Sequence, residues 1–226
     1  MARLEWDVQG AHLYETGVKN GVLYVVNNLG AYGTGVAWNG LTAVTESPSG
    51  AEANAIYADD IKYLNLYSVE EFGCTIEAYT YPDEFAECDG SASPVAGMNI
   101  GQQARKMFGF CFRTVVGNDV AGEEYGYKIH IIYGCKASPS EKSYQTINDS
   151  PEAITFSWEI STTPTNVTGY KATSCIVVDS TKFQATTAAQ NKLKLLEDYL
   201  YGSASKTPSL PLPDVIVGIL NGTITT

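Results

Sequence analysis

The segment between Glu46 and Phe72 constrains the fold of this chain more than any other feature of its sequence. Strands are predicted on both sides of it, at residues 41–45 and 74–80. Connections longer than about 12–15 residues are uncommon inside compact domains, and this one is longer. It is also rich in aliphatic and tyrosine side chains, so it must fold back on its own core or become buried against a neighbouring molecule.

The rest of the chain predicts a mainly β fold. Alternation is clearest at residues 154–161, where Ile154, Phe156, Trp158 and Ile160 share one face. Residues 105–116 and 124–136 predict a long hairpin, and we expect both apolar faces of its first strand to be covered. Shorter strands are expected at 22–26, 173–178 and 214–220, and the turn at 39–40 predicts a second hairpin.

One amphipathic helix is predicted at residues 187–201. Its stripe is formed by Ala189, Leu193, Leu196 and Leu200, and Gly202 ends it. Residues 82–88 are expected to form a single helical turn. We expect one domain over residues 1–226, mainly β with one flanking α-helix (α+β), with an N-terminal arm at 1–20 and an extended C-terminal arm at 203–226.

Composition and charge argue against several classes of function. The formal net charge is −11, with 14 basic residues against 25 acidic ones, which is the wrong balance for gripping nucleic acid. The first residues lack the apolar core of a secretory signal, and no apolar stretch is long enough to span a membrane. The five cysteines show no CxxC spacing and are expected to be buried thiols.

No catalytic constellation is visible, so we expect no enzyme, no cofactor and no metal. The two histidines, His12 and His130, are far apart in the sequence and lack metal-ligand spacing. Neighbouring acids in the pairs 59–60 and 70–71 point to opposite sides of an extended backbone. A denser acidic cluster at residues 83–89 suits a helix N-terminus, with calcium binding left open as the alternative.

Several segments, in matching order and spacing, resemble the major tail proteins of long-tailed, non-contractile bacteriophages (siphoviruses). The first group comprises Glu46-Ser-Pro-Ser-Gly-Ala-Glu52, Tyr57-Ala-Asp-Asp-Ile-Lys-Tyr63 and the run from Thr80 to Gly90. The second comprises Phe108-Gly-Phe-Cys-Phe-Arg-Thr114, the run from Tyr127 to Gly134, residues 142–150, Phe156-Ser-Trp-Glu-Ile-Ser-Thr162, the run from Leu195 to Gly202, and Leu210-Pro-Leu-Pro-Asp214. The chain departs from the family at Val215, where an acid is usual.

The resemblance implies a fold and a function. The family has a β-sandwich/barrel tail-tube fold, forms hexameric rings and stacks them into the tube that conducts DNA from capsid to host cell. Implied partners are further copies of the chain, a tape-measure protein and tail-end proteins. Double-stranded DNA passes through without specific binding, and no membrane is involved. The implied location is the virion, after assembly in the host bacterial cytoplasm.

The resemblance also assigns roles to residues. Residues 46–72 become a long stacking loop between rings, with contact residues Ile56, Tyr57, Asp59, Asp60, Ile61, Tyr63, Leu66 and Tyr67. Glu77 and Glu159, on polar strand faces, are candidates for the lumen, where an acidic wall would not retain phosphates. Two alternatives stay open: a solitary β-sandwich that binds a receptor or carbohydrate, and the tube protein of a secretion system.

Overall fold

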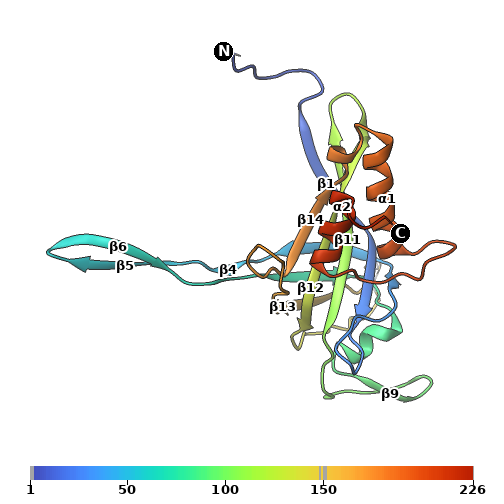
Figure 1. The fold of residues 1–226 in the computed structure, drawn as a ribbon. Helices are drawn as coiled ribbons and strands as arrows, with labels where there is room; N and C mark the ends of the chain where they lie inside the picture. The colour runs from blue at the N-terminus through green and yellow to red at the C-terminus, as the bar shows by residue number, and fades with distance from the viewer. Residues whose placement is uncertain (1–2, 148, 150–151, 226) are drawn as a thin grey trace.

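The computed structural model describes residues 3–147, 149 and 152–225 and shows a mostly β chain with two helices (Figure 1). Its strands are β1 (Leu13–Val25), β2 (Val36–Trp38), β3 (Leu41–Glu46), β4 (Ser49–Gly50), β5 (Ala53–Ala58), β6 (Ile61–Tyr67), β7 (Glu70–Glu71), β8 (Gly73–Ala78), β9 (Ala92–Val95), β10 (Met98–Ile100), β11 (Phe108–Asn118), β12 (Gly122–Ala137), β13 (Phe156–Thr162) and β14 (Cys175–Asp179). The helices are α1 (Thr187–Tyr201) and α2 (Pro213–Asn221), with 3-10 turns η1 (Asp83–Glu87) and η2 (Ser180–Phe183). This is the expected β-rich α+β class, although the sheets of the described residues do not close into a barrel.

One antiparallel sheet forms the body, in the order β2-β1-β11-β12-β13-β8-β3, with β14 also paired to β12. The predicted hairpin of β11 and β12 lies at its centre. The second predicted hairpin is wrong, because β2 pairs with β1 whereas β3 pairs with β8. The Asn39–Gly40 turn, with a φ of 80° at Gly40, therefore carries the chain from one end of the sheet to the other.

Strand β12 contains a β-bulge at Gly134. Phe110 pairs with Ile132 but Phe108 pairs with Cys135, so β12 has one extra residue there. Gly134 has a φ of 61°, and a Cβ atom on it would lie 2.2 Å from the Thr163 carbonyl oxygen. Before the bulge β12 pairs with β14, and after it with β13, so the bulge redirects the strand between two partners.

Side chains from both faces of β11 are buried, as predicted. Phe108, Phe110 and Phe112 pack under β3, β8 and β13 in an aromatic cluster that includes Trp38, Phe85 and Trp158. On the other face, Cys111 lies in a second cluster with the helices. The chain therefore covers both faces of this strand itself. All five cysteines are free thiols, and four of them are buried as expected, whereas Cys175 is half-buried.

Helix α1 confirms the predicted helix, with the same bounds. The Thr186 side chain accepts a hydrogen bond from the Ala189 N–H at 3.2 Å, and Gly202 follows the last turn with a φ of 81°. Leu193, Leu196 and Leu200 are buried against the sheet. The helical turn expected at residues 82–88 is also present, as η1.

The predicted extended C-terminal arm is wrong, and so is its strand at 214–220. Residues 213–221 form α2, whose Ile216 and Ile219 are buried in the second cluster. Buried tyrosines hold the preceding segments: the Tyr24 hydroxyl donates to the Leu200 carbonyl at 2.6 Å, and the Tyr133 hydroxyl to the Pro211 carbonyl at 2.8 Å. The segment thus packs on its own body; residue 226 lies outside the described residues.

The N-terminal arm is shorter than predicted. Strand β1 begins at Leu13 and pairs with β11 along its length, so residues 13–20 belong to the sheet. Residues 3–12 lie outside the sheet and project from one end of it (Figure 1). The Gly10 N–H donates to the Asp119 carboxylate, which ties the base of this segment to the β11–β12 turn. Residues 1 and 2 lie outside the described part of the chain.

Candidate assembly interface

The long segment 46–72 folds as a β-hairpin that projects far from the body (Figure 1). Its root is closed by the Ser47 N–H, which donates to the Gly73 carbonyl at 2.8 Å, and by the short β4–β7 pair. Strands β5 and β6 then pair from Ala53 and Tyr67 to the tip. The segment is thus a two-stranded ribbon, and the pairing at its root directs it away from the body.

Asp59 and Asp60 form the tip of the hairpin. Both have left-handed backbone conformations, with φ angles of 51° and 60°, and they join the paired residues Ala58 and Ile61. Two consecutive positive φ angles define a type I′ turn, whose twist matches the flanking strands. Aspartate tolerates this conformation better than most residues, so the two acids suit the turn. The expectation that residues 59–60 lie on an extended backbone is wrong, because both are left-handed turn residues.

A bulge sorts the apolar side chains of the hairpin onto two chemically different faces. Ile56 pairs with Leu64 but Tyr57 pairs with Lys62, so Tyr63 is the extra residue. The strand alternation then places the aliphatic residues on one face and the tyrosines on the other. We call these the aliphatic face, Ile56, Ile61, Leu64 and Leu66, and the tyrosine face, Tyr57, Tyr63 and Tyr67.

Both faces of the hairpin are open to solvent in the single chain. The seven side chains are between 38% and 69% exposed. Burying the surface of an aliphatic side chain that is still exposed would stabilise a complex by on the order of 1 kcal/mol per side chain. All eight predicted contact residues lie on this hairpin, and none is buried. A two-stranded ribbon with apolar side chains on both faces has the properties of a docking element.

The two lumen candidates lie on one face of the body. Glu77 pairs with Ser157, and Glu159 with Thr75, so the two carboxylates are diagonal neighbours on adjacent strands. Trp158 and Ile76 alternate with them and point into the aromatic cluster. Glu77 is half-buried and Glu159 exposed, whereas Lys136 lies at the border of this face, opposite Ser161.

In the acidic cluster at residues 83–89, Asp83 and Glu84 lie in the first turn of η1, as expected, whereas Asp89 and Glu87 are paired with basic residues. Asp89 is buried and pairs with Arg105 at 3.5 Å and with Lys142, while Glu87 pairs with Lys106. The described residues contain no group of three or more acids, histidines or cysteines that could hold a metal ion.

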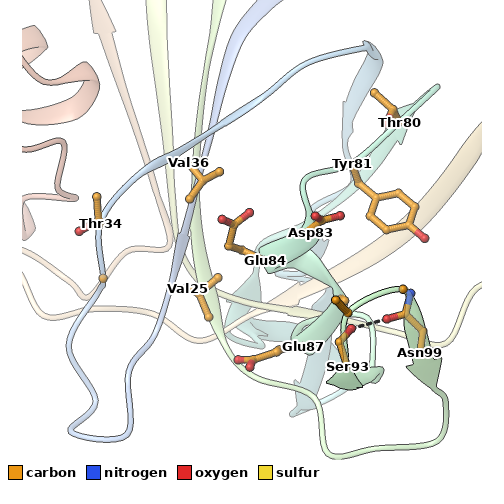
Figure 2. Close-up of a pocket in the computed structure, with 14 residues that line it drawn as sticks. Val25, Thr34, Val36, Thr80, Tyr81, Asp83, Glu84, Glu87, Ser93 and Asn99 are labelled. Atoms are coloured by element: carbon orange, nitrogen blue, oxygen red, sulfur yellow. Dashed lines mark hydrogen bonds between the residues drawn. The ribbon is translucent and has the colours of Figure 1, made fainter.

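The remaining acids, Asp83 and Glu84, line a cavity of about 840 Å³ together with Glu87 (Figure 2). Val25, Thr34 and Val36 line one side of it, and the β9–β10 hairpin, where Ser93 donates to the Asn99 side-chain oxygen, lines another. This hairpin was not predicted from the sequence. Its signal is Gly97, whose φ of 82° marks the turn.

His130 lies where the root of the hairpin meets the body. It is 8% exposed and stacks on Phe112, with ring centroids 4.5 Å apart and planes 8° from parallel. Its Nε2 lies 3.0 Å from the Thr114 hydroxyl and 3.5 Å from Glu15, and its Nδ1 lies 3.6 Å from Glu46, the last residue of β3. Burial, the largest cause, lowers the pKa of His130, although both carboxylates act in the opposite direction.

No protein-family model matches the sequence, and no curated protein matches it either. Among solved structures, the fold is similar to a chain in the cryo-EM structure of the anti-feeding prophage (AFP) baseplate, six-fold symmetrised, with a TM-score of 0.37 and 6% identity over 77% of this chain and 97% of that one.

Neither α1 nor α2, the helices of the described residues, has the length and apolar character needed to cross a membrane.

Proposed function

We propose that the chain is the structural subunit of a phage tail tube, in which rings of copies stack and the hairpin of each copy docks on the next ring. The observation that carries this proposal is the exposed two-faced hairpin. A monomer gains nothing from holding seven large apolar side chains in water, whereas a repeating assembly buries them at every layer. The role is structural rather than catalytic, and the hexameric ring and the passage of DNA come from the resemblance to siphovirus major tail proteins.

The arrangement of the body supports the same role. In Figure 1 the hairpin extends from one side, while α1 and the turn after it lie on the other. A contact between two different surfaces of identical copies is heterologous and repeats without closing when the copies are related by translation. This is the geometry that stacking requires, and it leaves the polar face with Glu77 and Glu159 available for a lumen.

The test compares the full chain with a variant in which residues 51–69 are replaced by an asparagine–glycine turn. Because β4 and β7 remain, the root stays paired and the body should keep its stability. Gel filtration with light scattering and negative-stain microscopy should show rings or tubes for the full chain and no stacked tubes for the variant. Thermal unfolding of the variant checks that its body is intact.

A point variant with a matched control sharpens this test. Ile61→Ser with Leu64→Ser makes the aliphatic face polar, whereas Leu29→Ser changes an even more exposed apolar side chain on the body. Only the hairpin variant should stop stacking. A full chain that stays a monomer or trimer would overturn the proposal and favour the receptor- or carbohydrate-binding alternative, and stacking that survives removal of the hairpin would also overturn it.

A further inference from the structure

We propose that His130 and Glu46 form a proton-operated latch at the root of the long hairpin, in which a proton bound between the two side chains fastens the root to the body and its loss releases it. The latch concerns how residues 46–72 are attached, rather than what they contact. Its use as a control of stacking rests on the proposed function, whereas the latch itself is a property of the single chain.

The pair joins the body to the point where the hairpin leaves it. His130 belongs to β12, in the centre of the sheet, and Glu46 is the last residue of β3. The next residue, Ser47, already closes the root through its N–H. The His130 ring is fixed by burial and by its stacking on Phe112, whereas the Glu46 side chain is 42% exposed. Glu46 is therefore the partner that is free to move.

Hydrogen bonds assign the proton of the neutral His130 ring to Nε2. The Thr114 hydroxyl lies 2.6 Å from Oε1 of Glu15 and donates its proton to that carboxylate. At 3.0 Å from Nε2 of His130, the hydroxyl oxygen can then only accept, so Nε2 is the atom that donates. In the neutral ring, Nδ1 is consequently an acceptor with no proton of its own.

This acceptor is buried and faces another acceptor. Nδ1 of His130 has no hydrogen-bond partner within the described part of the chain, and solvent does not reach it. Oε1 of Glu46 lies 3.6 Å away, so a nitrogen lone pair points towards a carboxylate oxygen. A buried acceptor without a donor is unfavourable. One proton on Nδ1 turns the same contact into a charge-assisted hydrogen bond and draws Glu46 towards the body.

The other charged groups around the ring are already matched. Glu15, from β1, accepts hydrogen bonds from Thr114 and Lys128. Asp179, from β14, lies opposite Lys128 and accepts from a backbone N–H at 2.9 Å. From β11 the ring meets Thr114 and Phe112, neither of which is charged. Glu46 is thus the acid left to share a proton with Nδ1.

The surrounding groups also set the pH at which the latch closes. Burial raises the pKa of Cys74 and of Cys175 to about 12, so these thiols beside Glu46 stay neutral. Burial lowers the pKa of His130, while the charges of Glu46 and Glu15 act to raise it. The latch therefore closes below about pH 6.5. Because the unfolded chain binds the proton more readily, closure tightens the root without raising the global stability.

Two substitutions of one residue hold the latch closed or open. Glu46→Gln places a side-chain N–H beside Nδ1 of His130, which supplies the missing donor at every pH. Glu46→Ala removes the contact and leaves the root open at every pH. Glu71→Gln is the control, because it removes an exposed charge from β7, in the same root, that does not act on His130.

Amide hydrogen exchange of the root, measured by mass spectrometry on the full chain, reports the state of the latch. Variants are compared at equal pH, which cancels the intrinsic pH dependence of exchange. We expect the unmodified chain and Glu71→Gln to match Glu46→Ala at pH 8 and to approach Glu46→Gln at pH 5. Protection should differ by at least about threefold between the closed and the open root. Unchanged protection of β11 and β12 checks that the body is intact.

Two results would overturn the latch. One is an unmodified chain whose root protection relative to Glu46→Gln is the same at pH 8 and pH 5. The other is equal root protection in Glu46→Gln and Glu46→Ala. Neither result bears on stacking, which microscopy measures separately. A chain that never assembles would remove the proposed function, while the exchange ratios would still decide whether the latch exists.

Discussion

The guanidinium of Arg113, near the middle of β11, is paired with the carboxylate of Glu197 on α1. The two side chains are 18% and 24% exposed. The Arg113 guanidinium also lies over the rings of Tyr127 and Tyr201, 4.4 and 4.5 Å from their centroids. The Tyr127 hydroxyl donates to the same carboxylate, and burial together with this hydrogen bond raises the pKa of Tyr127 to about 12. This network joins the helix to the sheet.

Replacing Glu197 should therefore destabilise the fold. Glu197→Ala leaves a largely buried guanidinium without its counter-charge and the Tyr127 hydroxyl without its acceptor. We expect a loss of about 2–4 kcal/mol in the free energy of unfolding, measured by urea denaturation. The neighbouring Asp198→Ala removes only an exposed i,i+4 pair with Lys194 and should change it by less than about 0.5 kcal/mol. Equal losses in the two variants would show that the network stabilises the fold no more than the Asp198–Lys194 pair does.

His130 predicts a pH dependence of stability. Because burial lowers its folded-state pKa below the ordinary value of about 6.5, the unfolded chain takes up the proton first. Stability is therefore complete above that value and falls as the pH drops through the window below it. Urea denaturation from pH 8 to 5.5 should show this fall, and His130→Gln should reduce it.

His12→Gln serves as the control, since it removes the exposed second histidine in the N-terminal segment. The pH profile of this variant should match that of the unmodified chain. If His130→Gln leaves the slope unchanged, the acid sensitivity must come from the carboxylates instead.

Some elements could be predicted from the sequence and others could not, and the difference has physical reasons. Helix α1 could be predicted fully because its stripe, Thr186 cap and Gly202 stop agree. Helix α2 was mistaken for a strand because an unbroken apolar run has no period. Its ends carried the missing signal: Pro213 stands in the first turn and Gly222, with a φ of 89°, follows the last.

The candidate interface could be located from its length and apolar content, but its organisation could not. The sorting into two faces depends on one bulge residue, Tyr63, which no local pattern marks. The acids of residues 83–89 were predicted in part, because Asp83 and Glu84 do lie in the first turn of η1, whereas the pairing of Asp89 could not be predicted. Arg105 and Lys142, which pair with Asp89, are distant in sequence, and only the tertiary fold brings them together.

The bulge at Gly134 predicts a severe effect of a small substitution. Gly134→Ala would place a methyl group 2.2 Å from the Thr163 carbonyl oxygen in a left-handed conformation that disfavours alanine. We expect a loss of about 2–4 kcal/mol in the free energy of unfolding. Gly101→Ala is the matched control, because a Cβ atom there meets nothing within 4 Å. Similar stability of both variants would mean that β12 does not need its bulge.

The lumen assignment leads to a prediction about DNA. Glu77→Lys with Glu159→Lys converts two diagonal acids on one sheet face into a basic pair without touching the hairpin. If this face lines the tube, tubes should still form, but released DNA should be slowed by salt-dependent attraction to the lysines. Retention of double-stranded DNA in purified tubes at rising salt measures this effect. Glu123→Lys with Glu124→Lys adds the same charge at an exposed end of β12 and should leave retention unchanged, because these positions lie outside the proposed lumen. Equal retention by both double variants would place the polar face elsewhere in the assembly.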